Sequence, residues 1–146
     1  MDNKIPTTEE IKDFLKEYGW SFREDRGLLI APYALEEQKK GILIGFHIEG
    51  EFVMVSTIDM LNKVPSTFAV SFLTLNDTIK LAKVYATPSS EPNYLDINIS
   101  FELWSDSWNK NTFFTFLDML CLGIENTLKF TTDKNIPHQT NFVTFS

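Results

Sequence analysis

Apolar residues near the start of the chain recur three or four positions apart, which is the spacing of one face of an α-helix. Thr7 precedes this stripe as a helix-capping residue, and Glu10 follows three residues later, where it completes a capping box. Gly19 predicts the end of the helix, because glycine accepts the left-handed conformation common at helix ends. The stripe consists of Ile11, Phe14, Leu15 and Tyr18.

Two further segments have helical spacing. Ser66 or Thr67 is a suitable cap for a second helix that runs to about residue 82. Residues 109–130 form a long third helix, in which apolar side chains cover most of the circumference. A helix with so wide an apolar arc normally contacts more than one layer, so we expect it to pack on a sheet and on another helix or a second subunit. Gly123 permits a close approach to this helix.

Segments with the spacing of strands lie between these helices. Residues 94–103 alternate between apolar and polar side chains, which predicts a strand with one face in the core and one in water. Residues 41–48 and 51–57 are strand-like and meet at Glu49-Gly50, where we expect a tight hairpin. Gly45 lies in the middle of the first of these strands and indicates a bulge or a closely packed helix.

The order of the elements predicts the fold class. Two shorter strands are expected at residues 28–30 and 83–87, and residues 58–64 are expected to form a loop or a single helical turn. The order is then helix, three strands, helix, two strands and helix, which predicts an α+β domain with helices packed on one antiparallel sheet. We assign residues 1–131 to this single domain and residues 132–146 to a polar, partly ordered C-terminal tail.

The charge of the chain narrows the classes of partner. It has 13 basic and 20 acidic residues, for a net charge of −7, so we expect no nucleic-acid partner because an acidic surface repels phosphate backbones.

The longest apolar stretch, residues 113–124, is interrupted by polar residues and is too short to cross a bilayer, so we expect no membrane partner. Cys121 is the single cysteine, which excludes an intramolecular disulfide framework, and no secretory leader is visible. We therefore expect a cytoplasmic protein.

The residue types that carry catalysis or bind metals are sparse. His47 and His138 have no partners at the spacing of a metal site, and the six glycines form no phosphate-binding loop. Cys121 lies between Leu120 and Leu122, an apolar setting that disfavours the reactive thiolate. We expect no metal, no cofactor and no enzymatic activity.

Aromatic residues near the third helix are the candidate contact surface. Trp104 and Trp108 flank a short loop, and tryptophan is enriched at interaction hot spots. Phe113, Phe116 and Met119 belong to the surplus apolar surface of the helix that follows. For the two indoles, the alternative to a contact surface is that they fold back and cover the core. For the helix, burial of its apolar face within one chain and burial in a homodimer interface both stay open.

A resemblance to a known family is carried by the helix Ile11-Lys12-Asp13-Phe14-Leu15 with Tyr18-Gly19-Trp20, by Phe52-Val53-Met54-Val55, Val64-Pro65, Leu73-Thr74-Leu75-Asn76 and Lys83-Val84-Tyr85, and by the strand Leu95 to Leu103. In these segments the chain resembles the YbjN-type bacterial domain family, which has the type III secretion chaperone-like fold. The resemblance implies a dimer-forming, non-enzymatic domain, and the better-understood secretion chaperones of this fold are small acidic homodimers that wrap an extended client segment.

Two classes of function follow. The first is a non-enzymatic, protein-binding module of chaperone-like or regulatory type, which would offer apolar grooves to a protein partner or client. The alternative is a small-molecule-binding or enzymatic domain with a pocket between the sheet and the last helix. His47, Tyr85 and Glu102 are the first polar groups to suspect in that pocket. A closed pocket with converging polar groups favours the alternative, and an exposed apolar groove favours the binding module.

Overall fold

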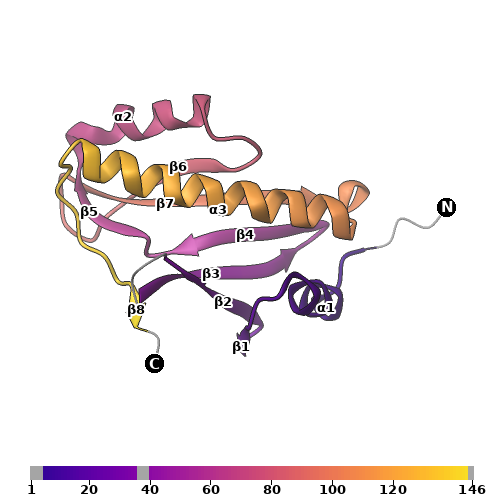
Figure 1. The fold of residues 1–146 in the computed structure, drawn as a ribbon. Coiled ribbons are helices and arrows are strands. Elements are labelled where there is room, and N and C mark those ends of the chain that lie inside the picture. Colours follow the sequence, from indigo (N-terminus) through magenta and orange to yellow (C-terminus); the bar gives the residue numbers. More distant parts are fainter. Residues whose placement is uncertain (1–4, 36–39, 145–146) are drawn as a thin grey trace.

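The computed structural model describes residues 5–35 and 40–144, and within them three helices and eight strands (Figure 1). The helices are α1 (Thr8–Tyr18), α2 (Ala69–Leu73) and α3 (Lys110–Asp133), with short 3₁₀ segments at Ser66–Phe68, Thr74–Asp77 and Ser105–Ser107. The strands are β1 (Arg23–Asp25), β2 (Leu28–Ala34), β3 (Lys40–Glu49), β4 (Phe52–Ile58), β5 (Leu61–Pro65), β6 (Lys83–Pro88), β7 (Tyr94–Trp104) and β8 (Val143–Thr144). The α+β class predicted from the sequence is confirmed.

All strands pair antiparallel in one sheet, and β7 is its longest strand and pairs with β4, β5 and β6. Ser100 of β7 pairs with Ser56 of β4 and with Lys83 of β6, so β4 and β6 lie on opposite edges of β7. Ile97 pairs with β5 and β6, which places β5 on the same edge as β4. The sheet therefore runs β1, β2, β3, then β4 with β5 as its continuation, then β7 and β6.

The join between β4 and β5 corrects the prediction of a loop or helical turn at residues 58–64. The backbone bends at Asp59, which has a positive φ of 50°, and then resumes pairing with β7. The side chain of Asn98 on β7 stabilises the bend, because its Oδ1 accepts hydrogen bonds from Thr57 Oγ1 (2.8 Å) and from the Met60 amide (3.1 Å). These partners are distant in sequence, so local sequence patterns do not reveal the bend.

The core lies between one face of the sheet and the layer formed by α1 and α3 (Figure 1). Phe113 of α3 is at its centre, with its ring near those of Phe46 on β3 and Phe101 on β7. The ring of Phe114 packs between Phe14 and Tyr18 of α1. The ends of α1 agree with the prediction, since Thr7 accepts from the Glu10 amide and Gly19 is left-handed with a φ of 93°.

The wide apolar arc of α3 is covered from more than one side within the chain. Besides the sheet and α1, α2 contributes Phe72, whose ring lies 5.4 Å from that of Phe130. Gly123 is buried, and a Cβ atom at this position would lie 3.2 Å from Cγ2 of Ile79. The close approach predicted at Gly123 is therefore made by the segment that follows α2.

The second helix is shorter than predicted. Instead of one helix over residues 66–82, α2 spans Ala69–Leu73 between two 3₁₀ segments, the second ending at Asp77. The hydroxyls of Thr74 and Thr78 donate to the carbonyls of Ser71 and Leu75 and so offer the backbone local alternatives to a long helix. Ile79 and Ala82, which lie within the predicted helix, are buried, but an irregular segment carries them.

Two other boundaries differ from the prediction. β2 continues beyond residue 30 and through Pro32, which is tolerated because β1 pairs only with Leu28–Ile30 and leaves the rest of β2 an edge on that side. The β3–β4 turn consists of Gly50 and Glu51, one residue later than predicted, since Glu49 pairs with Phe52.

The C-terminal segment after α3 returns along the sheet. Ile136 is buried in the core, and Gln139 exchanges two backbone hydrogen bonds of 2.7 Å with Asn62. β8 then pairs with the start of β3. α3 itself ends at Asp133, three residues later than predicted. Within the described residues, no helix is both long and apolar enough to cross a membrane.

Candidate functional site: the open face of the sheet

The sheet has a second face, opposite α3, which we call the open face. Because side chains alternate along a strand, the residues between the buried Val53, Val55, Phe101 and Leu103 lie on this face. The register aligns Gly45, Ser56 and Ser100 in one row across three neighbouring strands. A glycine and two small serine side chains in one row lower the middle of the face between larger neighbours.

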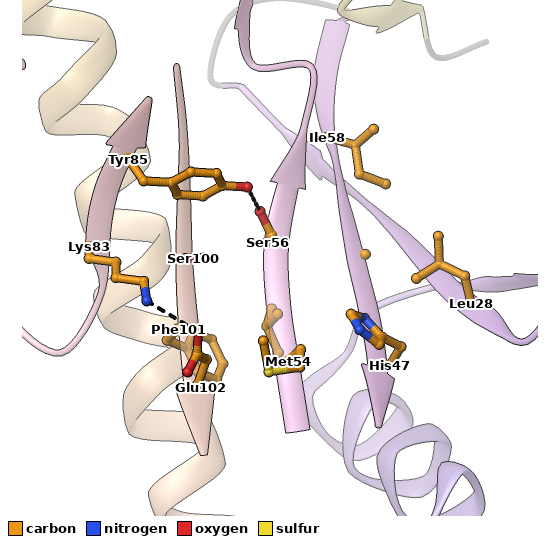
Figure 2. A pocket seen from close by; sticks show the side chains of 12 residues that line it. Leu28, His47, Met54, Ser56, Ile58, Lys83, Tyr85, Ser100, Phe101 and Glu102 are labelled. Atoms are coloured by element: carbon orange, nitrogen blue, oxygen red, sulfur yellow. Dashed lines mark hydrogen bonds and ion pairs between the residues drawn. The ribbon is translucent and has the colours of Figure 1, made fainter. Parts of the chain in front are cut away.

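A hollow of about 510 Å³ occupies this lowered region. Figure 2 shows it from the open side, with α3 behind the sheet and with Met54, Ile58 and Leu28 among the side chains around it. Gly45 is neither at a bulge nor beneath a helix, contrary to the prediction. A Cβ atom there would lie 3.2 Å from Cδ1 of Ile58 and 3.3 Å from Cδ1 of Leu28, so glycine lets these two side chains close over the strand.

Four of the polar groups around the hollow bond in two pairs (Figure 2). The Ser56 hydroxyl lies 2.9 Å from the Thr57 carbonyl, to which it donates, and shares a hydrogen bond of 2.7 Å with the Tyr85 hydroxyl. Lys83 Nζ and Glu102 form an ion pair at 3.1 Å. Among the described residues, the Ser56 hydroxyl bonds to the Thr57 carbonyl and to the Tyr85 hydroxyl, and neither is a general base. The arrangement is suited to binding apolar groups.

An exposed aromatic pair extends the hollow toward the β3–β4 turn. Phe52 and Trp104 are cross-strand neighbours on the open face, with 42% and 47% of their surface exposed. They adjoin the next row of the register, in which Met54 pairs with His47 and Glu102. Large apolar side chains exposed in one continuous area are typical of a binding surface.

The five candidate contact residues predicted from the sequence do not form one site. Trp104 lies on the open face, whereas the half-buried Trp108 packs on Phe113 at a ring distance of 5.0 Å. Phe113 is 0% exposed, so its place in the candidate surface is corrected to the core. Phe116 and Met119 are half-buried on α3, on the other side of the sheet.

The three polar residues suspected in a pocket do come together. His47, Tyr85 and Glu102 all line the hollow. The hollow, however, lies on the face of the sheet away from α3 and not between the sheet and the last helix, where core side chains such as Phe101 and Phe113 pack together. The position of the pocket in the alternative hypothesis was therefore wrong.

Sequence reasoning missed the apolar members of the open face. Leu28, Phe52, Met54 and Ile58 were not assigned to any candidate site. The sequence did contain a signal for the second apolar face. Residues 52–55 are apolar at four consecutive positions, so both faces of this strand carry apolar side chains. A strand that is covered on one face only needs apolar side chains on that face alone.

Two tyrosines join α3 to its neighbours around Cys121. The Tyr18 hydroxyl donates to Asp118, and the Tyr33 hydroxyl donates to Glu125 at 2.9 Å. Burial, followed by the nearby carboxylates of Asp118 and Glu125, raises the pKa of the Cys121 thiol to about 12. The thiol is therefore a poor nucleophile. Among the described residues, no three histidine, cysteine or acidic side chains gather as a metal site would require.

Comparison with known proteins identifies the fold. No protein-family model matches the chain, and no curated protein matches it in sequence. The crystal structure of YbjN from E. coli, for which a role as a transcription regulator has been suggested, superposes with a TM-score of 0.69. The match covers 91% of this chain and 96% of that one at 14% sequence identity. The chain therefore has the YbjN fold.

Proposed function

We propose that the protein is a non-enzymatic binding module whose open face holds an apolar segment of a partner protein. The observation that carries the proposal is the continuous exposure of Phe52 and Trp104 beside the hollow lined by Met54 and Ile58. Apolar area of this kind loses contact with water on association, at about 25 cal/mol per Å². The pairing of Ser56 with Tyr85 and of Lys83 with Glu102 supports binding over catalysis.

The similarity to YbjN is compatible with a regulatory role. The role suggested for YbjN, which shares the fold, is regulation of transcription. With a net charge of −7, this chain would act on such a process through a protein and not by direct contact with DNA. A regulatory module of this kind needs a specific partner surface, and the exposure of Phe52 and Trp104 supports the open face as that surface.

A small apolar ligand is the second candidate for the same hollow. Its volume of about 510 Å³ is within the usual range of ligand pockets, about 300–1,000 Å³. His47, Tyr85 and Glu102 converge on it from three strands. This candidate predicts an occupant of low molecular mass that co-purifies with the folded protein and is identified by mass spectrometry after denaturation.

Differential capture tests the partner proposal. The tagged protein and its Met54→Ser/Ile58→Ser variant are incubated with native cytosol, and retained proteins are quantified by mass spectrometry. The matched control is Val70→Ser/Leu73→Ser, which removes two exposed apolar side chains from α2. We expect one or a few proteins to be retained by the wild type and the control but not by the open-face variant, and the purified partner to reproduce this pattern.

Other outcomes contradict the proposal. A partner lost with the α2 control but kept by the open-face variant would place the interface on α2. No specific partner, together with a co-purifying small molecule, would favour the second candidate. Circular dichroism of each variant verifies that both remain folded.

A further inference from the structure

The exposed aromatic pair has acidic neighbours on the same face. Cross-strand pairing sets Glu49 beside Phe52 and Phe52 beside Trp104 in one row. The Glu51 carboxylate accepts a hydrogen bond from the Trp104 indole N–H at 3.3 Å, which places it at the edge of the ring. Glu102 lies two residues before Trp104 on β7 and therefore points to the same face. Three carboxylates thus surround two exposed rings.

Few positive charges balance these carboxylates. Lys83 pairs with Glu102 at 3.1 Å, and His47 lies 3.6 Å from Glu49, where it carries charge only when protonated. The Glu49 side chain is 74% exposed and open to a further partner. The Trp104 indole N–H, which donates to Glu51, lies in the plane of the ring, so this hydrogen bond does not occupy the face of the ring. The face is the part of an aromatic ring that attracts cations.

We propose that this end of the open face binds a lysine or arginine side chain of the partner segment, while apolar side chains of the same segment enter the hollow. The inference rests on the proposed function and adds the chemistry of the partner to it. Carboxylates around a half-exposed indole, with Glu51 at its edge, select a cation, whereas the hollow selects apolar groups. The occupant is therefore an extended segment in which basic and apolar residues are adjacent.

Synthetic peptides of about 12 residues test the chemistry without a known partner. The first alternates leucine and lysine, the second replaces every lysine by glutamate, and the third replaces every leucine by serine. Affinity for the intact protein is measured by fluorescence anisotropy at about 0.15 M salt, which screens long-range attraction to the net charge. The Trp104 indole N–H signal, assigned by its loss in Trp104→Leu, reports contact by NMR.

We expect the leucine–lysine peptide to bind at least about fivefold more tightly than both other peptides and to shift the Trp104 signal. Trp104→Leu, which keeps an apolar side chain, and Glu49→Gln/Glu51→Gln should each weaken binding by roughly fivefold. The control Glu9→Gln/Glu17→Gln removes two charges from α1, on the other side of the sheet, and should change the affinity by less than about twofold.

Three results would overturn the inference without deciding the proposed function, which the capture experiment tests separately. They are equal affinity for the lysine and glutamate peptides, an equal loss of affinity in the open-face variants and the α1 control, and no binding of any peptide. A concentration-dependent dimer that Phe52→Ser abolishes would show that a second copy of this chain occupies the face. If a native partner is captured but Trp104→Leu and Glu49→Gln/Glu51→Gln leave its affinity unchanged, the proposed binding function is supported and the cation site is rejected.

Discussion

The side chain of Asn76 makes both of the hydrogen bonds to the main chain of Val84 that a neighbouring strand would make. Its Oδ1 accepts from the Val84 amide at 2.7 Å, and its Nδ2 donates to the Val84 carbonyl at 3.1 Å. Val84 lies on β6, the strand at the outer edge of the sheet beside β7. One asparagine thus closes part of an edge that would otherwise be available to other strands.

Replacing Asn76 should weaken the fold and open this edge. Asn76→Leu leaves two main-chain groups of Val84 without a partner, and we expect a loss of about 2 kcal/mol in the free energy of unfolding. Asn76→Asp keeps the acceptor but not the donor and should lose less. Urea unfolding measures both, with the exposed Asn111→Leu on α3 as the control. Equal stability of Asn76→Leu and Asn111→Leu would contradict this role.

Alanine substitution should separate the core aromatic residues from those of the surface. Phe113 is completely buried, so Phe113→Ala creates a cavity and should cost about 3–5 kcal/mol in the free energy of unfolding. Trp104 is 47% exposed, and Trp104→Ala should cost less than about 1 kcal/mol. Thermal unfolding followed by circular dichroism compares the two. A large loss with Trp104→Ala would argue against its availability to a partner.

Gly123 and Ile79 should be energetically coupled. A Cβ at position 123 would lie 3.2 Å from Cγ2 of Ile79, a methyl group fixed on a branched carbon that cannot turn aside freely. The crowding, about 1–3 kcal/mol, should outweigh the gain of about 1 kcal/mol in helix propensity for Gly123→Ala. In a double-mutant cycle with Ile79→Ala, the double variant should lose less stability than the sum of the single losses. Additive losses would show that the helix shifts without strain.

The pKa of Cys121 predicts loss of stability at high pH. Below about pH 9 the thiol is protonated in both the folded and the unfolded chain, so it contributes nothing. Between about pH 9 and 12 only the unfolded thiol ionises, which favours unfolding and lowers the melting temperature. Cys121→Ala should flatten this decline, and its failure to do so would contradict the prediction. At pH 8 a thiol reagent should react at least about a hundredfold more slowly with the folded than with the unfolded protein.

The helix boundaries and strand alternation that the sequence predicted depend on neighbours close in the chain. Thr7 and Gly19 bound α1 because a cap and a left-handed glycine act within one helical turn. The alternation of residues 94–103 identified β7, and the hairpin between β3 and β4 was found to within one residue. His47, Tyr85 and Glu102 were selected as polar candidates, and the structure places all three around one hollow.

By itself, the sequence determined where α1, α3 and the main strands lie and which side chains are apolar, because periodicity and capping are local. Only the tertiary structure decided that β4 bends into β5 beside β7, that Phe113 is enclosed, and that the hollow opens on the face away from α3. Those outcomes depend on strand register and on which layer covers which face. Register aligns Gly45, Ser56 and Ser100 across separate strands, a relation between residues up to 55 positions apart that no local pattern encodes.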